Sequence, residues 1–404
     1  MTLVSQLDVP EIDYNDPTLV GERFHETLAE LTAKHWLAKV DIGYLVLERE
    51  AAMTVLRDRR LSFPAVQIVL LQGIDSGPVY DRTVNGLMTK SGEPHLRMRR
   101  LVAPGLSPRS IERLRVKLRE ILEDLWKKVA GRGRTEFVAD FAQRIPSALI
   151  AELLGVPGEA ERLARWSILL QAVFKMNMAE DREAVERAYE EVRAWVLELL
   201  AERRERPGED FISTVGTVEV DGDRLSDDEC VTLVASVISG GTDTTQAQLA
   251  HGLRLFAEQP SQWELLASRP AELASQAANE VLRYEPITPF TARLVQQELE
   301  YRDVSFPEGT LLFACAATAN RDGEAFVNPD VFDISIDRGR TPVLTFGFGD
   351  HFCLGAQLAR MEITESLAFL APRMRALRID GEPRFGSIKG IYAMESLPLA
   401  FGDS

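Results

Sequence analysis

Apolar residues recur at helical spacing over much of the chain. One amphipathic pattern, rich in charge, runs over about 181–206 and is ended by Pro207-Gly208. The longest pattern begins at Ser226 and continues to about Glu258; Ser226 and Glu229 have the spacing of a capping box. A helix of that length spans about 50 Å, enough to cross a domain. A further pattern begins at Ile111. One face of its 3.6-residue period is formed by Ile111, Leu114, Leu118, Ile121, Leu122 and Leu125.

Strand-like stretches are few and short. The better candidates are 42–47, 304–306 and 311–315, and the last two flank the turn sequence Pro307-Glu308-Gly309-Thr310. The pattern therefore predicts a mainly α fold with a small β portion. Over 404 residues there is no Pro/Ser/Gly-rich linker, low-complexity tract or internal repeat, so one large domain is expected, with residues 1 to about 17 loosely held.

The middle of the longest predicted helix has an unusual composition. Its sequence is Ser239-Gly240-Gly241-Thr242-Asp243-Thr244-Thr245, in which each glycine costs about 1 kcal/mol against alanine. Close helix packing would explain the two glycines, but it would not explain the carboxylate and hydroxyls beside them. A groove that makes room for a small ligand explains both.

A second unusual segment surrounds Cys353. It reads Thr345-Phe346-Gly347-Phe348-Gly349-Asp350-His351-Phe352-Cys353-Leu354-Gly355, and strong helix formers follow it. A cysteine just before a helix is favoured as thiolate by the helix dipole. The alternative, a small buried hydrophobe, suits Cys315 and Cys230, which lie in or beside apolar runs, better than Cys353. We therefore interpret Cys353 as a metal ligand.

Charge and cysteine content exclude several classes of protein. The formal net charge of -16 argues against general nucleic-acid binding. Three cysteines give no disulfide framework. No signal peptide or membrane anchor is visible, since the longest apolar stretch, 231–238, falls far short of the ~20 residues that span a bilayer. A cytoplasmic location is expected.

The Cys353 segment resembles the haem-binding signature of bacterial cytochromes P-450. The matching positions are Phe346, Gly349, His351, Cys353 and Gly355, followed by Leu358-Ala359-Arg360. With the motifs described next, the resemblance covers about 95–360. It implies the cytochrome P-450 fold, a single helical domain with a long central helix. It also implies haem b, with Cys353 as the thiolate ligand and Phe346 and Gly355 beside the cofactor.

The segment 239–245 resembles the oxygen-binding motif of the same family. By that resemblance Gly240 and Gly241 open space beside the haem, and Asp243 and Thr244 form an acid–alcohol pair that relays protons during oxygen activation.

Glu280 and Arg283, three residues apart on one predicted helix face, resemble the family's structural Glu-x-x-Arg pair. In many members an arginine further along completes a triad, but Val331 stands at the expected position here. Either the triad is reduced to a pair, or another base such as Arg338 substitutes.

Four cationic or polar donors match the family's contacts to the haem propionates. His95 and Arg99 lie four residues apart and share a helix face, and the resemblance adds Arg293 and His351. Carboxylates inside a protein require such partners, because an unpaired buried charge is costly.

Basic residues cluster between 97 and 119 of this acidic chain. For any single residue a solvated helix face is the simpler interpretation. The functional interpretation is a docking surface for an acidic iron–sulfur ferredoxin supplied by an NAD(P)H-dependent reductase. The arginines expected to contribute are Arg97, Arg100, Arg109 and Arg113.

Three apolar stretches fall where the family's substrate regions lie, and they suggest a lipophilic small molecule. Ordinary core packing explains each residue equally well. The candidate contacts are Val66, Val69, Leu70, Phe174, Ile287, Pro289 and Phe290, with Met176 and Met178 in the same region as Phe174.

These features predict a monooxygenase that activates O2 with ferredoxin electrons and inserts one oxygen atom into a lipophilic molecule, in secondary or xenobiotic metabolism. Two alternatives remain. One is the same fold doing other oxidations: peroxygenase chemistry, decarboxylation, ring coupling, or oxidation of a carrier-tethered substrate. The other is a non-catalytic haem sensor or auxiliary protein.

Overall fold

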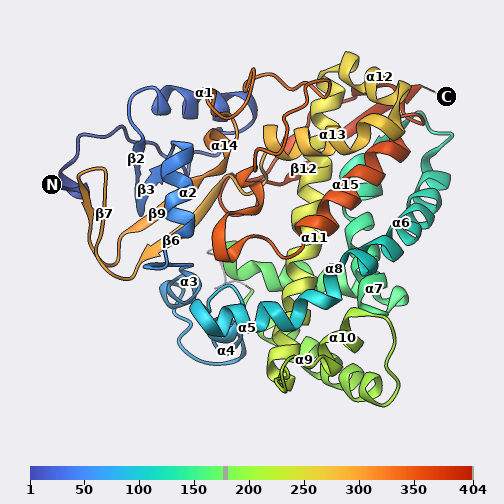
Figure 1. Ribbon diagram of the computed structural model, residues 1–404. Coiled ribbons are helices and arrows are strands. Elements are labelled where there is room, and N and C mark those ends of the chain that lie inside the picture. Colours follow the sequence, from blue (N-terminus) through green and yellow to red (C-terminus); the bar gives the residue numbers. More distant parts are fainter. Residues whose placement is uncertain (176–180, 403–404) are drawn as a thin grey trace. The chain divides into compact units, whose positions relative to one another are not determined.

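The computed structural model describes residues 1–175 and 181–402, which are mainly helical with small sheets (Figure 1). They cluster into two compact units. The first comprises Met1–Pro64, Glu280–Cys353 and Phe385–Ala393; the second comprises Ala65–Asn279, Leu354–Arg384 and Met394–Ser404. Each unit is assembled from separated stretches of chain, and their union in one domain stays a prediction.

The first unit is built on a five-stranded sheet of order β2-β3-β9-β6-β4. Only the β3–β9 pair is parallel. A second sheet has the order β1-β8-β7. The strands are β1 (Thr2–Leu3), β2 (Leu37–Val40), β3 (Gly43–Val46), β4 (Leu61–Ser62), β6 (Phe290–Val295), β7 (Leu299–Tyr301), β8 (Val304–Phe306) and β9 (Leu311–Cys315), with helices α1 (Gly21–Thr32), α2 (Arg49–Arg57) and α14 (Ala316–Ala319).

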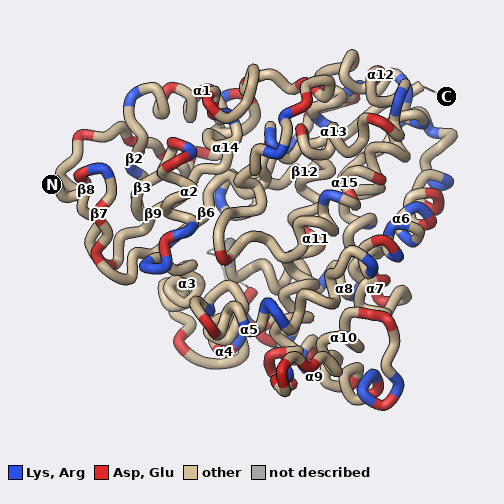
Figure 2. Tube along the Cα trace, in the orientation of Figure 1, with Lys and Arg blue, Asp and Glu red and all other residues tan. Residues whose placement is uncertain are grey.

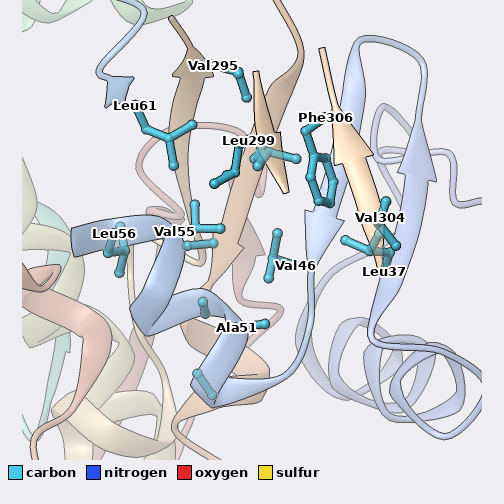
Figure 3. Packing of buried hydrophobic residues seen from close by; sticks show 14 of the residues in the cluster. Leu37, Val46, Ala51, Val55, Leu56, Leu61, Val295, Leu299, Val304 and Phe306 are labelled. Atoms are coloured by element: carbon cyan, nitrogen blue, oxygen red, sulfur yellow. The ribbon is translucent and has the colours of Figure 1, made fainter. Parts of the chain in front are cut away.

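A hydrophobic core fills the space between α2 and these strands. Ala51 and Val55 of α2 face Val46 of β3 and Leu61 of β4, and Leu299 and Phe306 extend the same cluster (Figure 3). Because residues four apart on a helix share a face, α2 can present these side chains together.

The N-terminal segment differs from the expectation of a loose tail. Thr2 and Leu3 pair with Val304 and Ser305 in parallel register, and Val4 is buried in the same core. Further along, the Ile12 N–H donates to the Lys39 carbonyl at 3.0 Å. The reason is that these backbone groups complete the edges of sheets formed by strands distant in sequence, a contact that local composition does not indicate.

The second unit is dominated by helices. Its sheet has the order β10-β13-β5. Helices and strands assigned to it, wholly or in large part, are α3 (Ala65–Leu71), α4 (Pro78–Asn85), α5 (Gly92–Val102), α6 (Pro108–Val129), α7 (Arg144–Leu154), α8 (Ala160–Gln171), α9 (Arg182–Glu205), α10 (Phe211–Thr217), α11 (Asp227–Glu258), α12 (Pro260–Ser268), α13 (Pro270–Tyr284), α15 (Ala356–Leu370), β5 (Arg134–Glu136), β10 (Arg375–Ile379), β11 (Arg384–Phe385), β12 (Met394–Ser396) and β13 (Pro398–Gly402).

Helix α11 is the long helix predicted from the sequence. The capping box is present: Ser226 Oγ accepts from the Glu229 N–H at 3.2 Å, and the Glu229 carboxylate accepts from the Ser226 N–H at 2.9 Å. Helices α7, α8, α9 and α15 all pack against α11, so much of its surface is buried. No helix within the described residues is both long enough and apolar enough to cross a membrane.

Near the end of α13, Glu280 and Arg283 form a buried ion pair with N–O distances of 2.8 Å. Arg338 completes a triad, because its guanidinium donates to both oxygens of Glu280 at 2.8 and 3.1 Å. Val331 contributes its carbonyl oxygen, which accepts from Arg283 and Arg338, while its side chain is exposed. Arg338 is therefore the substitute base that the sequence left as one of two alternatives.

We expect replacement of Arg338 by methionine to lower the free energy of unfolding by about 1.5–3 kcal/mol, because Glu280 would keep a buried charge with one partner fewer. Burial alone would raise the pKa of Glu280, but hydrogen bonds from Arg283 and Arg338 outweigh it and lower that pKa below 4.5. The stabilisation is therefore present above about pH 4.5 and is lost as the pH falls further.

Urea unfolding at several pH values measures this effect. Arg302→Met is the matched control, since Arg302 pairs with Glu48 and Glu50 in the same unit at a more exposed position and should cost less than about 1 kcal/mol. Equal losses in the two variants at neutral pH would contradict the structural role of Arg338.

Candidate active site

Cys353 follows a sharply bent segment of the first unit and is exposed. Two glycines make the bend: Gly347 has φ 71° and Gly349 has φ 76°, values that side chains disfavour. A Cβ on Gly349 would also lie 3.2 Å from Arg57 Cα. The two glycines before the cysteine are thus required by the backbone path, as their spacing in the sequence indicated.

Hydrogen bonds hold this segment in place. The Cys353 N–H donates to the Phe346 carbonyl at 2.9 Å, and the rings of Phe346 and Phe352 meet edge to face. The buried side chain of Asn320 accepts from the Leu344 N–H at 2.7 Å and donates to Thr345 Oγ1 at 2.9 Å. Nothing in the local sequence singled out Asn320, because its partners lie about 25 residues further along.

The other two cysteines are unsuited to bind a metal. Both are buried, and burial raises the pKa of Cys230 to about 12 and raises that of Cys315 as well. Their thiols therefore stay protonated, whereas the metal ligand is the thiolate. The core interpretation of Cys230 and Cys315 agrees with this placement.

Arg293, on β6, is a buried cation. Its side chain is 4% exposed, and its Nη1 donates to the Ala292 carbonyl at 2.9 Å. Burial lowers its pKa to about 10. Within residues 1–175 and 181–402 no carboxylate pairs with it, so the guanidinium fits an anionic group supplied by a ligand. His351, half-buried, lies in the turn just before Cys353.

In the second unit His95 and Arg99 lie one turn apart on α5. His95 is buried and Arg99 is half-buried. Their shared face is consistent with a pair of donors for a carboxylate, and that role remains a prediction.

The two glycines of α11 have different surroundings. A Cβ on Gly240 would meet nothing within 4 Å, whereas one on Gly241 would lie 2.5 Å from Ile150 Cδ1 of α7. Gly241 is thus explained by helix packing, whereas Gly240 is itself exposed and leaves open space beside the helix. The sequence pattern did not distinguish these two roles.

Asp243 and Thr244 lie beside this opening. Thr244 is four residues after Gly240, and its Oγ1 donates to the Gly240 carbonyl at 2.6 Å. Asp243 is half-buried, and its Oδ1 accepts from Ser167 Oγ of α8 at 3.1 Å. The Thr244 hydroxyl therefore lies against the Gly240 backbone, and the residue before it, Asp243, carries a carboxylate. Sequence reasoning missed Ser167.

The predicted substrate contacts are mixed in their surroundings. Val69, Ile287 and Pro289 are buried, Val66 is half-buried and Leu70 is exposed. Phe290 packs edge to face on Phe24 in a core cluster, which favours the core interpretation for that residue. Phe174 lies in the turn Ala172–Lys175 after α8, while Met176 and Met178 fall outside the described residues.

The residues present fit a haem. In the described part of the chain no group of three His, Cys, Asp or Glu side chains is arranged to hold a metal ion. The exposed thiol of Cys353 suits a metal whose other ligands come from a macrocycle. Arg293 suits the anionic substituents of that macrocycle, and the space at Gly240 suits a small ligand.

Comparison with known proteins gives the same picture. A family model described as Cytochrome P450 matches residues 271–370. The chain is 35% identical over 403 residues to a luteothin monooxygenase of Streptomyces thioluteus, covering 98% of this chain and 97% of that protein. It is 31% identical over 401 residues to a steroid C26-monooxygenase of Rhodococcus jostii, covering 95% and 83% respectively.

Solved structures agree in fold. The crystal structure of CalO2 superposes with a TM-score of 0.90 at 25% identity, covering 98% of this chain and all of the other. P450BioI, solved with an acyl carrier protein carrying hexadec-9Z-enoic acid, gives a TM-score of 0.84 at 27% identity, covering 96% and 99%. Because relatives above 30% identity align over nearly the whole chain, it belongs to the cytochrome P450 family and is a haem monooxygenase with the Cys353 thiolate as axial ligand.

Proposed function

We propose that this monooxygenase takes its electrons from an acidic ferredoxin and inserts one oxygen atom into a lipophilic small molecule. The observation that carries the proposal is the arrangement on α11, where Gly240 leaves space and Thr244 and Asp243 lie beside it. A haem sensor or auxiliary protein would have no need of that acid–alcohol pair.

When bound, the haem supplies reductive activation of O2 and transfer of one oxygen atom. The chain's own residues hold the cofactor and deliver protons. Cys353 would supply the thiolate that binds the haem iron, and Arg293, His351, His95 and Arg99 would hold the propionates.

Thr244 and Asp243 would move protons. The Thr244 hydroxyl can accept one hydrogen bond while it donates another, so it can pass a proton on if it turns away from the Gly240 carbonyl. Asp243, the residue before Thr244 in the chain, would in turn take a proton from solvent and resupply Thr244.

Replacing Thr244 by alanine should reduce product formed per NAD(P)H by about tenfold and raise hydrogen peroxide correspondingly, because proton delivery slows. The assay uses a surrogate ferredoxin and reductase. Thr242→Ala is the matched control, since Thr242 makes the same contact to a carbonyl four residues earlier, at 2.9 Å, but is buried. Full coupling in Thr244→Ala would reject the relay.

The proposal of a lipophilic substrate draws on the relatives and on the composition of this chain. Two relatives have names that refer to luteothin and to a steroid, and the candidate regions of this chain are apolar. A spectral-shift screen of steroids, fatty acids and polyketides would find the compound with the largest response, which we call the probe compound.

The arginines predicted to dock a ferredoxin differ in how their charges are paired. Figure 2 shows acidic and basic residues interleaved along α6. Arg97 is held by both Asp223 and Glu229, Arg100 pairs with Glu93, and Arg113 pairs with Glu209. Arg109 is the most accessible of the predicted set, with 85% of its side chain exposed and Glu209 at 3.5 Å. We therefore place the main docking contribution on Arg109, with Arg97 stabilising the fold.

Reversing Arg109 to glutamate should slow reduction by ferredoxin about fivefold at low salt, because an exposed charge contact of ~1 kcal/mol is lost. The difference should shrink as salt is added. Lys127→Glu is the control, since Lys127 lies near the far end of the same helix and is 70% exposed. Stopped-flow reduction rates that fall equally in both variants would contradict a specific docking site.

A further inference from the structure

Two residues of α8 converge on one place on α11. Ser167 and Gln171 are four residues apart, so they share a face of α8, and both are buried, with 0% and 8% exposed. Their targets on α11, Ser239 and Asp243, are also four residues apart. The contact lies within the second unit, where α8 and α11 pack together.

The distances show how the donors are shared. Gln171 Nε2 donates to the Ser239 carbonyl at 3.0 Å. Ser167 Oγ lies 3.1 Å from Asp243 Oδ1 and 3.4 Å from the Ser239 carbonyl. A hydroxyl has one proton, so it can donate to only one of these two acceptors at a time.

The carboxylate is the better acceptor for that proton. It is closer than the carbonyl, and hydrogen bonds to a charged group are the stronger ones. The carbonyl is already engaged by Gln171. Gln171 therefore keeps Ser167 directed at Asp243 by occupying the competing carbonyl.

We propose that Ser167, supported by Gln171, is a positioning residue that fixes the Asp243 carboxylate beside Thr244 for proton delivery. This inference rests on the relay role proposed above. Its physical basis is that the half-buried side chain of Asp243 has several rotamers open to it, and a buried donor on the neighbouring helix selects one of them.

Ser167→Ala removes the donor and leaves a side chain that fits the same packing. With the probe compound, surrogate ferredoxin and reductase, we expect product per NAD(P)H to fall roughly threefold to tenfold and peroxide to rise. The solvent deuterium isotope effect on product formation should increase. Gln171→Met, which keeps the length but loses the donor, should give a smaller change in the same direction.

The double variant Ser167→Ala/Gln171→Met separates positioning from simple packing. If Gln171 acts through Ser167, the double variant should match Ser167→Ala in coupling, whereas independent packing defects would add. Ser147 is a buried serine of α7 whose hydroxyl donates to the nearby Gln143 and Arg144 carbonyls, so Ser147→Ala should couple normally.

Asp243→Asn, measured in parallel, distinguishes the two levels of the proposal. If Asp243→Asn couples like the unmodified protein, the relay itself is wrong. If Asp243→Asn is uncoupled but Ser167→Ala is fully coupled, with an unchanged isotope effect and melting temperature, the positioning role is overturned.

Discussion

The cysteine segment depends on one buried side chain, Asn320, because that residue joins it to the ion-pair network. Arg283 donates to the Asn320 carbonyl at 3.0 Å, while the Asn320 side chain holds Leu344 and Thr345. Thr345 in turn donates to the Leu282 carbonyl of α13. A continuous set of hydrogen bonds thus runs from Glu280 to the start of the bend that ends at Cys353. The Glu280–Arg283–Arg338 triad can be understood as the anchor of this network rather than as a part of the chemistry.

A metal ligand has to be exposed at its sulfur and fixed in its backbone, and the first unit meets both needs. Glycines give the path its sharp turns, and backbone bonds prevent it from collapsing onto the sulfur. The second unit meets a different need, since helix α11 must carry a carboxylate and a hydroxyl next to open space. There a missing side chain at Gly240 makes the space, and close packing at Gly241 holds the helix to α7.

Much of this was predictable from local sequence. The capping box at Ser226, the extent of α11 and the strands around Pro307 follow from short-range patterns, and all are present. The bend before Cys353 follows from its glycines. The pairing of Thr2 with Val304 and the contacts of Asn320 and Ser167 could not be predicted, and the sequence left Arg338 as one of two alternatives for the third member of the triad without deciding between them. Each of these contacts joins residues that lie from about 25 to 300 positions apart, and serine or asparagine in a loop or helix gives no signal of a distant partner.

The most direct test of the account is the absorption spectrum of the reduced, haem-loaded protein under carbon monoxide. Thiolate ligation by Cys353 predicts a red-shifted Soret band in the unmodified chain and in the buried-cysteine control Cys230→Ala, and loss of that band in Cys353→Ser. A band that persists in Cys353→Ser, or that is missing from the unmodified protein, would contradict the assignment of the ligand and with it the account of the site.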